Sequence, residues 1–145
     1  MTDIKLRISE YLKNHRKMTL ATVNAQGNPL AHTVEYVSVG DDVYFATRKD
    51  TRKAENIRQN SHVAYTVDED YADWMKIQGV QMEGEAFVVT DEAMIKQVYG
   101  LYIEKFPFVA DFPPNPELIF VGIKPRVASF LDYEKGFAHR DKVVY

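Results

Sequence analysis

The stretch FATRKDTRKAENI, residues 45–57, holds the side chains of this sequence that are best suited to bind an anion. Its four cations are Arg48, Lys49, Arg52 and Lys53. A strand that ends at Thr47 and a helix that begins near Thr51 would place free backbone N–H groups and two hydroxyls beside the second pair of cations. Helix N-terminal amides and charge-assisted hydrogen bonds are the usual donors to a phosphate group. A run of cations also commonly coats a solvated turn, and spacing alone leaves both interpretations open.

Few other residues form a catalytic or metal-binding pattern. The chain has no cysteine, which excludes thiol catalysis, disulfides, iron–sulfur clusters and cysteine-ligated zinc. Its four histidines, at positions 15, 32, 62 and 139, lack the spacing of metal ligands, so we predict no metal site. His32 falls in the middle of an alternating strand and could point into the interior of the fold. No pattern identifies a catalytic acid, base or nucleophile.

Length and composition indicate one globular domain spanning residues 1–145. The chain is 46% hydrophobic and 27% charged, which is typical of globular proteins. No stretch reaches membrane-spanning length and the N-terminus lacks the apolar core of a signal peptide, so we expect a cytoplasmic protein with no membrane partner. The net charge of -3 argues against nucleic-acid binding. The cation cluster therefore suits a small anion better than a polymer.

The hydrophobic pattern predicts a mainly β chain with a few short helices. Helical spacing predicts helices over 3–16, from about 51 to 60, and over 91–104. Alternation and turn residues predict strands over 18–25, 30–39, 43–47, 61–67, 74–89, 118–123, 126–133 and 141–145. Gly79 and Gly84 are expected sites of a bulge or a close backbone approach. The proline-rich segment 105–117 is expected to be an irregular loop. Counted without the shortest of these segments, about six or seven mostly antiparallel strands favour a small closed β-barrel over a parallel sheet.

The order of these segments resembles the FMN-binding split barrel of the pyridoxamine 5′-phosphate oxidase superfamily, an antiparallel fold of Greek-key type. The similarity runs from about Met18 to Tyr145. Its motifs are Gly27-Asn28-Pro29, VQMEGEAFVV, FLDYEKGFAHRD and, most specifically, Thr51-Arg52-Lys53-Ala54. The last motif resembles the Ser/Thr-Arg-Lys-Ala turn with which the family binds phosphate.

The resemblance implies a set of cofactor contacts. Arg52 and Lys53 would bind the FMN phosphate, with Thr51 at the adjoining helix start and Thr47 near the ribityl chain or the ring. His32 stands where the oxidase has an arginine that also reaches the phosphate. The two remaining positions implied near the flavin are Phe130 and Arg140. Because FMN lies at the dimer interface in this family, the resemblance also implies a homodimer in which Arg140 acts across subunits.

The departures from the family pattern concern mainly its substrate site. Val37 replaces a substrate-binding lysine, Gly136-Phe137-Ala138 replaces an Arg-x-His motif, and Gly79 replaces a flavin-contacting glutamine. We therefore expect an FMN-dependent oxidoreductase that acts on an unknown small molecule or electron donor rather than on pyridoxamine phosphate. The alternatives are a non-enzymatic FMN-binding or electron-transfer module, a deazaflavin in place of FMN, and a haem-binding or haem-degrading split barrel. The candidate axial ligands for haem are His32, His62 and His139.

Overall fold

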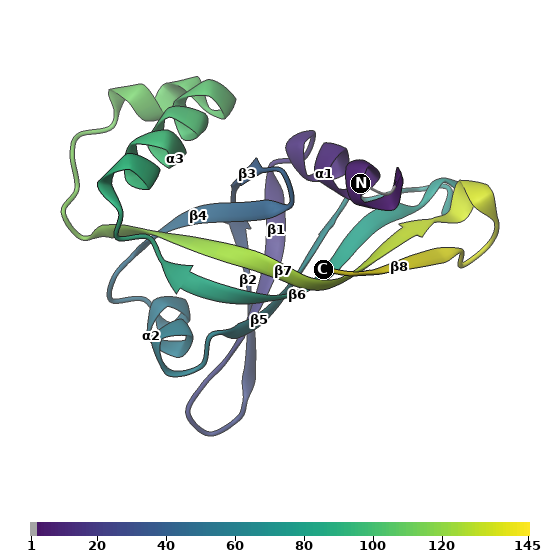
Figure 1. Ribbon diagram of the computed structural model, residues 1–145, viewed down its shortest axis with the longest axis horizontal. Coiled ribbons are helices and arrows are strands. Elements are labelled where there is room, and N and C mark those ends of the chain that lie inside the picture. Colours follow the sequence, from purple (N-terminus) through teal and green to yellow (C-terminus); the bar gives the residue numbers. More distant parts are fainter. Residues whose placement is uncertain (1–2) are drawn as a thin grey trace.

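The computed structural model describes residues 3–145, which form a curled antiparallel sheet flanked by helices (Figure 1). The helices are α1 (Asp3–Lys13), α2 (Arg52–Gln59) and α3 (Glu92–Lys105), with three short 3-10 helices, η1 (Trp74–Lys76), η2 (Pro107–Asp111) and η3 (Tyr133–Lys135). The strands are β1 (Lys17–Val23), β2 (Pro29–Glu35), β3 (Val37–Val39), β4 (Asp42–Arg48), β5 (His62–Asp68), β6 (Gln78–Val88), β7 (Leu118–Asp132) and β8 (Arg140–Val144). The predicted mainly β class is confirmed.

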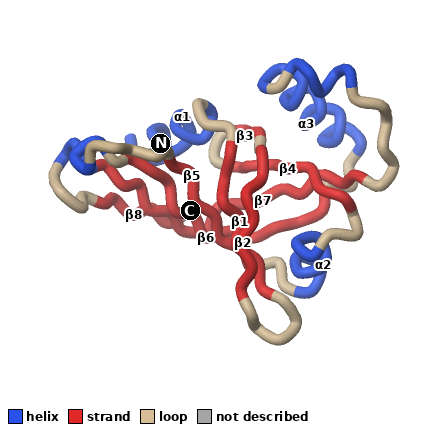
Figure 2. Tube along the Cα trace, turned by 180° about the vertical axis from the view of Figure 1, so that it is seen from behind, coloured by secondary structure: helices blue, strands red, loops and turns tan. Residues whose placement is uncertain are grey.

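The sheet curls because its two end strands are neighbours in the chain. Its strand order is β2-β1-β5-β6-β7-β4-β3, with β8 paired to β7. Only Tyr36 separates β2 from β3, so the two ends are drawn together and the sheet curls into a half-barrel (Figures 1 and 2). The Tyr36 hydroxyl donates to the carbonyl oxygen of Leu12 at 2.6 Å, and its N–H donates to that of Arg16 at 3.1 Å. These bonds hold the bend that divides the strand predicted over 30–39.

β6 and β7 form the long central pair of the sheet, and they carry its bulge. The register shifts at Gly84, which pairs with Pro125. A Cβ on Gly84 would lie 2.7 Å from the carbonyl oxygen of Lys124, so the close approach expected there is confirmed. The irregularity accommodates a proline inside the sheet. For that reason β7 runs unbroken where two strands, 118–123 and 126–133, were predicted.

Several other boundaries differ from the sequence-based prediction. α1 ends earlier than expected, and residues 74–76 form η1 before β6 begins. The segment 105–117 is not wholly irregular, because Pro107 stands at the start of η2, where its missing N–H costs no helical bond. Gly79 stays in register, and a Cβ there would lie 3.1 Å from the carbonyl oxygen of Val67. Gly79 is therefore a close approach and not a bulge.

The helices cover different parts of the sheet. α1 buries Ile8 and Leu12 in the core of the half-barrel. α3 buries Val98 and Tyr102 in a second apolar cluster with residues of β3 and β4. α2 packs on β1, close to the β1–β2 hairpin that projects from the sheet (Figure 2). The start of α2 thus lies where β1, β2 and β4 come together.

Candidate functional site

The turn between β4 and α2 has the geometry of an anion-binding helix start. Thr51 is the N-cap of α2, and its hydroxyl oxygen accepts a hydrogen bond from the Ala54 N–H at 3.3 Å. The Thr51 hydroxyl donates to the carbonyl oxygen of Arg48 at 3.1 Å and lies 3.0 Å from the hydroxyl of the buried Thr47. The backbone N–H groups of the next two residues lie in the first helical turn and have no intrahelical acceptor. They form the positive end of the helix, where negative charge is favoured.

A buried polar contact fixes where α2 begins relative to the sheet. The Asn56 side-chain amide donates to the Thr22 hydroxyl at 3.0 Å, and both side chains are buried. Ile57 adds an apolar contact with the core from the same helix. Because Thr22 belongs to β1, this contact holds the start of α2 beside the hairpin that carries His32.

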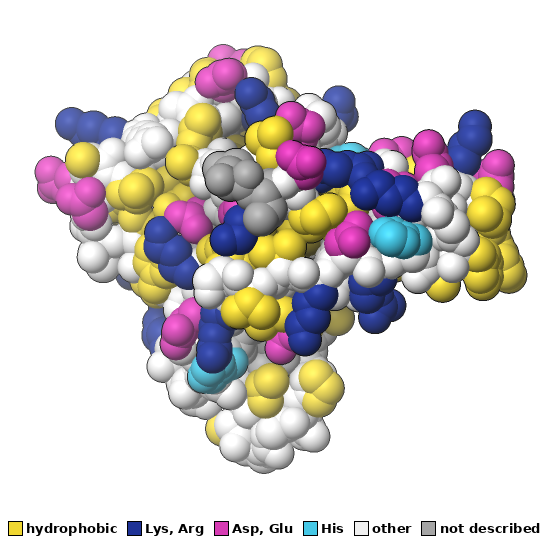
Figure 3. Space-filling model, turned by 45° about the vertical axis from the view of Figure 1, so that its right-hand side comes forward, with side chains coloured by type: hydrophobic (Ala, Val, Ile, Leu, Met, Phe, Trp, Pro, Cys, Tyr) yellow, Lys and Arg dark blue, Asp and Glu magenta, His cyan; other side chains and the backbone are white. Residues whose placement is uncertain are grey.

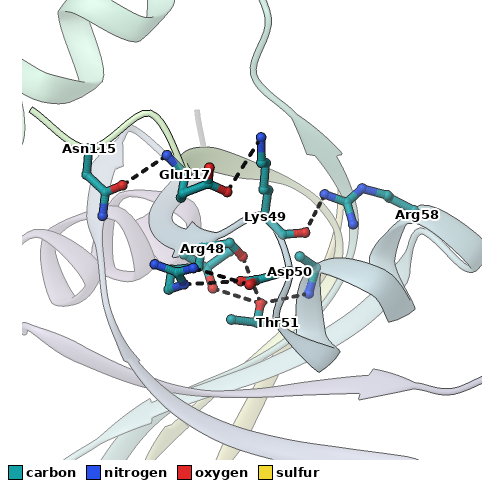
Figure 4. A network of polar contacts seen from close by, with 9 residues as sticks. Arg48, Lys49, Asp50, Thr51, Arg58, Asn115 and Glu117 are labelled. Carbon is teal, nitrogen blue, oxygen red and sulfur yellow. Dashed lines mark hydrogen bonds and ion pairs between the residues drawn. The ribbon is translucent and has the colours of Figure 1, made fainter.

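Most cations of this region have partners of their own (Figure 4). Arg48 pairs with Asp50 at 3.1 Å, and the Lys49 ammonium lies 3.5 Å from the Glu117 carboxylate. Arg58 donates to the carbonyl oxygen of Lys49 at 2.7 Å. The first two cations of the cluster therefore already have carboxylate partners. Lys49 joins the turn to α2 through its carbonyl oxygen and to the chain before β7 through its ammonium group.

Arg52 and Lys53 differ from these neighbours. Within residues 3–145, no hydrogen bond or ion pair joins either side chain to another group. Burial lowers the pKa of Lys53, and the positive charge of Arg52 lowers it further. Two adjacent cations are thus held close together, with no carboxylate to neutralise them. An anion bound at the helix start would supply the missing negative charge.

His32 lies beside this pair of cations. Burial lowers the pKa of its imidazole, and the charges of Lys53 and Arg52 lower it further. Its Nδ1 atom is buried without a hydrogen-bond partner among the described residues. The unpartnered nitrogen and the unpaired cations suit a ligand that carries several acceptor oxygens, as a phosphate does. The structure therefore brings five of the predicted residues together: His32, Thr47, Thr51, Arg52 and Lys53.

A groove of about 890 Å³ opens beside Lys53. Its walls come from β2, from α3 and from the segment between α3 and β7, and most of its lining is apolar or aromatic. The α3 residues that line it are Ile95, Tyr99 and Tyr102, and Phe106 follows directly after the helix. The Tyr102 hydroxyl donates to the carbonyl oxygen of Glu35 and accepts from the Ala46 N–H, both at 3.1 Å, which ties α3 to β2 and β4. Such a volume is typical of a small-molecule site.

Sequence reasoning missed this groove. The α3 lining residues follow the spacing of one helical face, which is a detectable signal. The same spacing is typical of a helix packed on a core, so it does not identify a ligand site. The opposite wall comes from β2, far away in the chain, and only the fold reveals that these surfaces face each other.

Phe130 and Arg140 lie away from the cation pair. Phe130 is 1% exposed, and its ring packs beneath α1 with the ring of Tyr11 at 5.7 Å and the Arg7 guanidinium at 4.7 Å. Arg140 begins β8 and pairs with Leu131, in the part of the sheet that contains the last residues of β5. α2 precedes the first residue of β5, so the two sites lie toward opposite ends of the sheet, as Figures 1 and 2 show. Their predicted role at the cofactor stays a prediction.

The described residues contain no group of three or more histidine, aspartate or glutamate side chains that could hold a metal ion. Among residues 3–145 no helix is long and apolar enough to cross a bilayer. Figure 3 shows basic and acidic side chains interleaved over the visible face, with hydrophobic side chains at its right-hand edge. Trp74 and Phe137 are the most exposed aromatic side chains, and their rings stack at 6.3 Å.

The fold is an antiparallel half-barrel, and its strand-to-helix turn presents two cations without a partner among residues 3–145. These features define a split-barrel protein. The family model described as pyridoxamine 5′-phosphate oxidase matches residues 4–132 of the sequence. The chain belongs to this family.

Three relatives illustrate the range of similar proteins. General stress protein 26 of Bacillus subtilis (strain 168) is 26% identical over 123 residues, which cover 85% of this chain and 84% of that protein. A putative pyridoxamine 5′-phosphate oxidase from Listeria innocua has a TM-score of 0.76 at 20% identity, covering 90% of this chain and 99% of the other. The haem storage protein HutZ from Vibrio cholerae has a TM-score of 0.73 at 18% identity, covering 86% and 92%. The two structural likenesses establish the fold.

Proposed function

We propose that this protein binds FMN through its phosphate and acts as a flavin-dependent oxidoreductase on a small molecule. The observation that carries the proposal is the contrast within one turn: Arg48 and Lys49 have carboxylate partners, whereas Arg52 and Lys53 have none. The buried Nδ1 atom of His32 is a third group without a hydrogen-bond partner among the described residues. A phosphate placed at the start of α2 would meet helix N–H groups and both cations.

Bound FMN would supply the hydride or electron chemistry. The chain's own residues would bind and orient it. Arg52 and Lys53 would hold the phosphate, and the Thr47 and Thr51 hydroxyls would lie at the strand edge beside it. The groove next to Lys53 would exclude water from a ligand through its aromatic walls. No side chain is assigned as a catalytic acid, base or nucleophile.

The proposed assembly is a homodimer with the cofactor between two copies. Proteins of this family are commonly dimeric. Arg140 and the cation pair lie toward opposite ends of one sheet, so both could contact the same FMN only if they came from different subunits. A monomeric mass in light scattering, retained when FMN is bound, would contradict this arrangement.

The first test is an absorption spectrum of the freshly purified protein between 300 and 500 nm, followed by mass spectrometry of the molecule that heating releases. A flavin spectrum with released FMN is the expected result, and a released deazaflavin would correct the identity of the cofactor. A colourless protein that also fails to bind added FMN would refute the proposal. Reduction of bound FMN by NADH or NADPH then separates an enzyme from a binding module, because a module would hold FMN without turnover.

Haem binding is the second candidate function, and the likeness to HutZ favours it as strongly as the fold favours FMN. Haem also carries anionic groups that the same cations could bind. Of the candidate axial ligands, His32 lies beside the cation pair, whereas His62 lines a separate cavity of about 320 Å³ and contacts Arg126. His139 contacts the Asp141 carboxylate at 3.1 Å. A Soret band on haemin titration that disappears in one histidine variant would favour haem over FMN.

A further inference from the structure

The groove beside Lys53 has a continuous aromatic wall. The rings of Tyr102 and Phe120 stack at 5.8 Å, and Phe106 lies 5.9 Å from Tyr102. Phe108 continues the series at 6.1 Å from Phe106, and Phe112 follows at 5.7 Å. The series of rings begins at the buried C-terminal end of α3 and continues into solvent along the segment that joins α3 to β7. Aromatic rings in such a series provide flat apolar faces for a flat ligand.

Several of these lining residues leave large apolar surface in water. Phe108 and Phe112 are 58% and 59% exposed, and Tyr99 and Leu118 are 43% and 47% exposed. All four line the same groove. Exposed apolar side chains that are gathered in one concave surface are typical of a binding site, whereas single exposed apolar side chains are common anywhere on a protein.

The lining of the groove carries few charges. Of its lining residues, only Lys53 and Glu35 are charged, and both come from outside α3 and the segment after it. In the proposed function Lys53 is occupied by the cofactor phosphate. A second anionic group would then meet Glu35 and aromatic rings, with no cation left in the lining to pair with it. Burial of an unpaired charge is costly.

We propose that this groove binds an uncharged, flat aromatic molecule, and that it rejects aromatic molecules that carry an anionic group. Its role as the substrate site and its rejection of anions rest on the proposed function, in which the phosphate occupies Lys53, whereas its preference for flat apolar rings rests on the groove alone. A phosphorylated substrate does not fit this surface. The groove thus explains in physical terms why the family's phosphate-bearing substrate is not expected here.

Two probes of the same ring size test the proposal: 2-naphthol, which is uncharged at pH 7, and 2-naphthalenesulfonate. Equilibrium dialysis against the protein saturated with FMN measures both affinities. We expect 2-naphthol to bind about tenfold more tightly or better, because the sulfonate has no partner in the groove. Equal binding of the two probes, or no binding of 2-naphthol by protein that binds FMN, would overturn the proposal.

A matched pair of variants locates the probe. Tyr99→Arg places a cation in the lining, whereas Gln97→Arg adds the same charge to an exposed position of α3 outside it. Tyr99→Arg is expected to reverse or abolish the preference for 2-naphthol, and Gln97→Arg to leave it unchanged. If Tyr99→Arg changes the mass in light scattering but not the naphthol affinity, a second copy covers the groove and the proposal is wrong.

The dialysis is repeated without FMN to separate the two proposals. Naphthol binding by a protein that does not bind FMN would support the ligand class while it refutes the flavin function. Binding of FMN together with equal binding of the two probes would support the flavin function and refute the proposed ligand class.

Discussion

Removal of Arg52 or Lys53 is the sharpest test of the phosphate site, because neither side chain has a partner to lose within residues 3–145. Arg52→Ala and Lys53→Ala therefore leave no carboxylate unpaired. Both positions lie in the first turn of α2, where alanine is well tolerated in a helix. We expect each variant to fold with near wild-type stability and to lose affinity for FMN alone.

The expected loss follows from the type of contact. A hydrogen bond between a charged donor and phosphate contributes about 1.5–3 kcal/mol, which corresponds to roughly 10- to 150-fold in affinity. Lys53 is partly buried, whereas Arg52 is exposed. Solvent and salt screen an exposed cation more strongly, so the larger loss is expected for Lys53→Ala and the greater salt dependence for Arg52→Ala.

Quenching of FMN fluorescence on binding to apoprotein measures these affinities, in low and in physiological salt. Arg48→Ala is the matched control: it removes a cation four residues away that already pairs with Asp50. Its affinity should change by about twofold at most. Wild-type affinity in both Arg52→Ala and Lys53→Ala would refute the assignment of this turn to a phosphate, as would an equal loss in Arg48→Ala.

Two further predictions concern stability. Burial and the nearby cations lower the pKa of His32 in the folded protein, whereas the unfolded chain has an ordinary value near 6.5, so the unfolded state binds more protons between the two values. The free energy of unfolding of the apoprotein should therefore decrease as pH falls below about 6.5. Urea unfolding across this range should show a smaller decrease for His32→Gln than for the wild type. The same pH dependence in both proteins would show that the imidazole is not desolvated. Gly84→Ala forces a Cβ against a backbone oxygen and should destabilise the protein by about 1–3 kcal/mol. Gly100→Ala, in open space within α3, should stabilise it by about 0.5–1 kcal/mol, and thermal unfolding that ranks the two variants the other way would contradict the packing at the bulge.

The β4–α2 turn was predictable because its information is local. A strand end, the N-cap Thr51 and the residues after it lie within a few positions of each other. Which of the cations are neutralised was not predictable, because the partner of Lys49 is Glu117, far along the chain. The sequence motif therefore located the candidate turn, and the tertiary contacts separated the cations that have partners from those that have none among the described residues.

The errors in the predicted strands also arise from contacts between residues that are far apart in the chain. The alternating pattern over 30–39 is continuous, and the bend at Tyr36 depends on carbonyl oxygens of α1 and its following loop. Pro125 is a correct signal for a break when read alone, but the register shift opposite Gly84 leaves Arg126 of β7 unpaired with β6 and keeps the strand continuous through the proline. Local propensity gives the wrong prediction at both positions. At Tyr36 a distant segment accepts the hydrogen bonds, and at Pro125 the pairing with the neighbouring strand shifts.

The position of Lys53 links the two proposed sites. It belongs to the proposed phosphate site at the start of α2 and also lines the aromatic groove. Without an anion, burial and Arg52 both disfavour its charge, so a bound phosphate would stabilise the charged amine and remove it as a partner for anything else in the groove. Cofactor binding would in this way determine which ligands the groove accepts. Lys53 could attract an anionic substrate, but it is occupied once the cofactor phosphate is bound. Selection for uncharged ligands would then be stronger with FMN bound than without it, a difference that arises from one side chain shared by two surfaces.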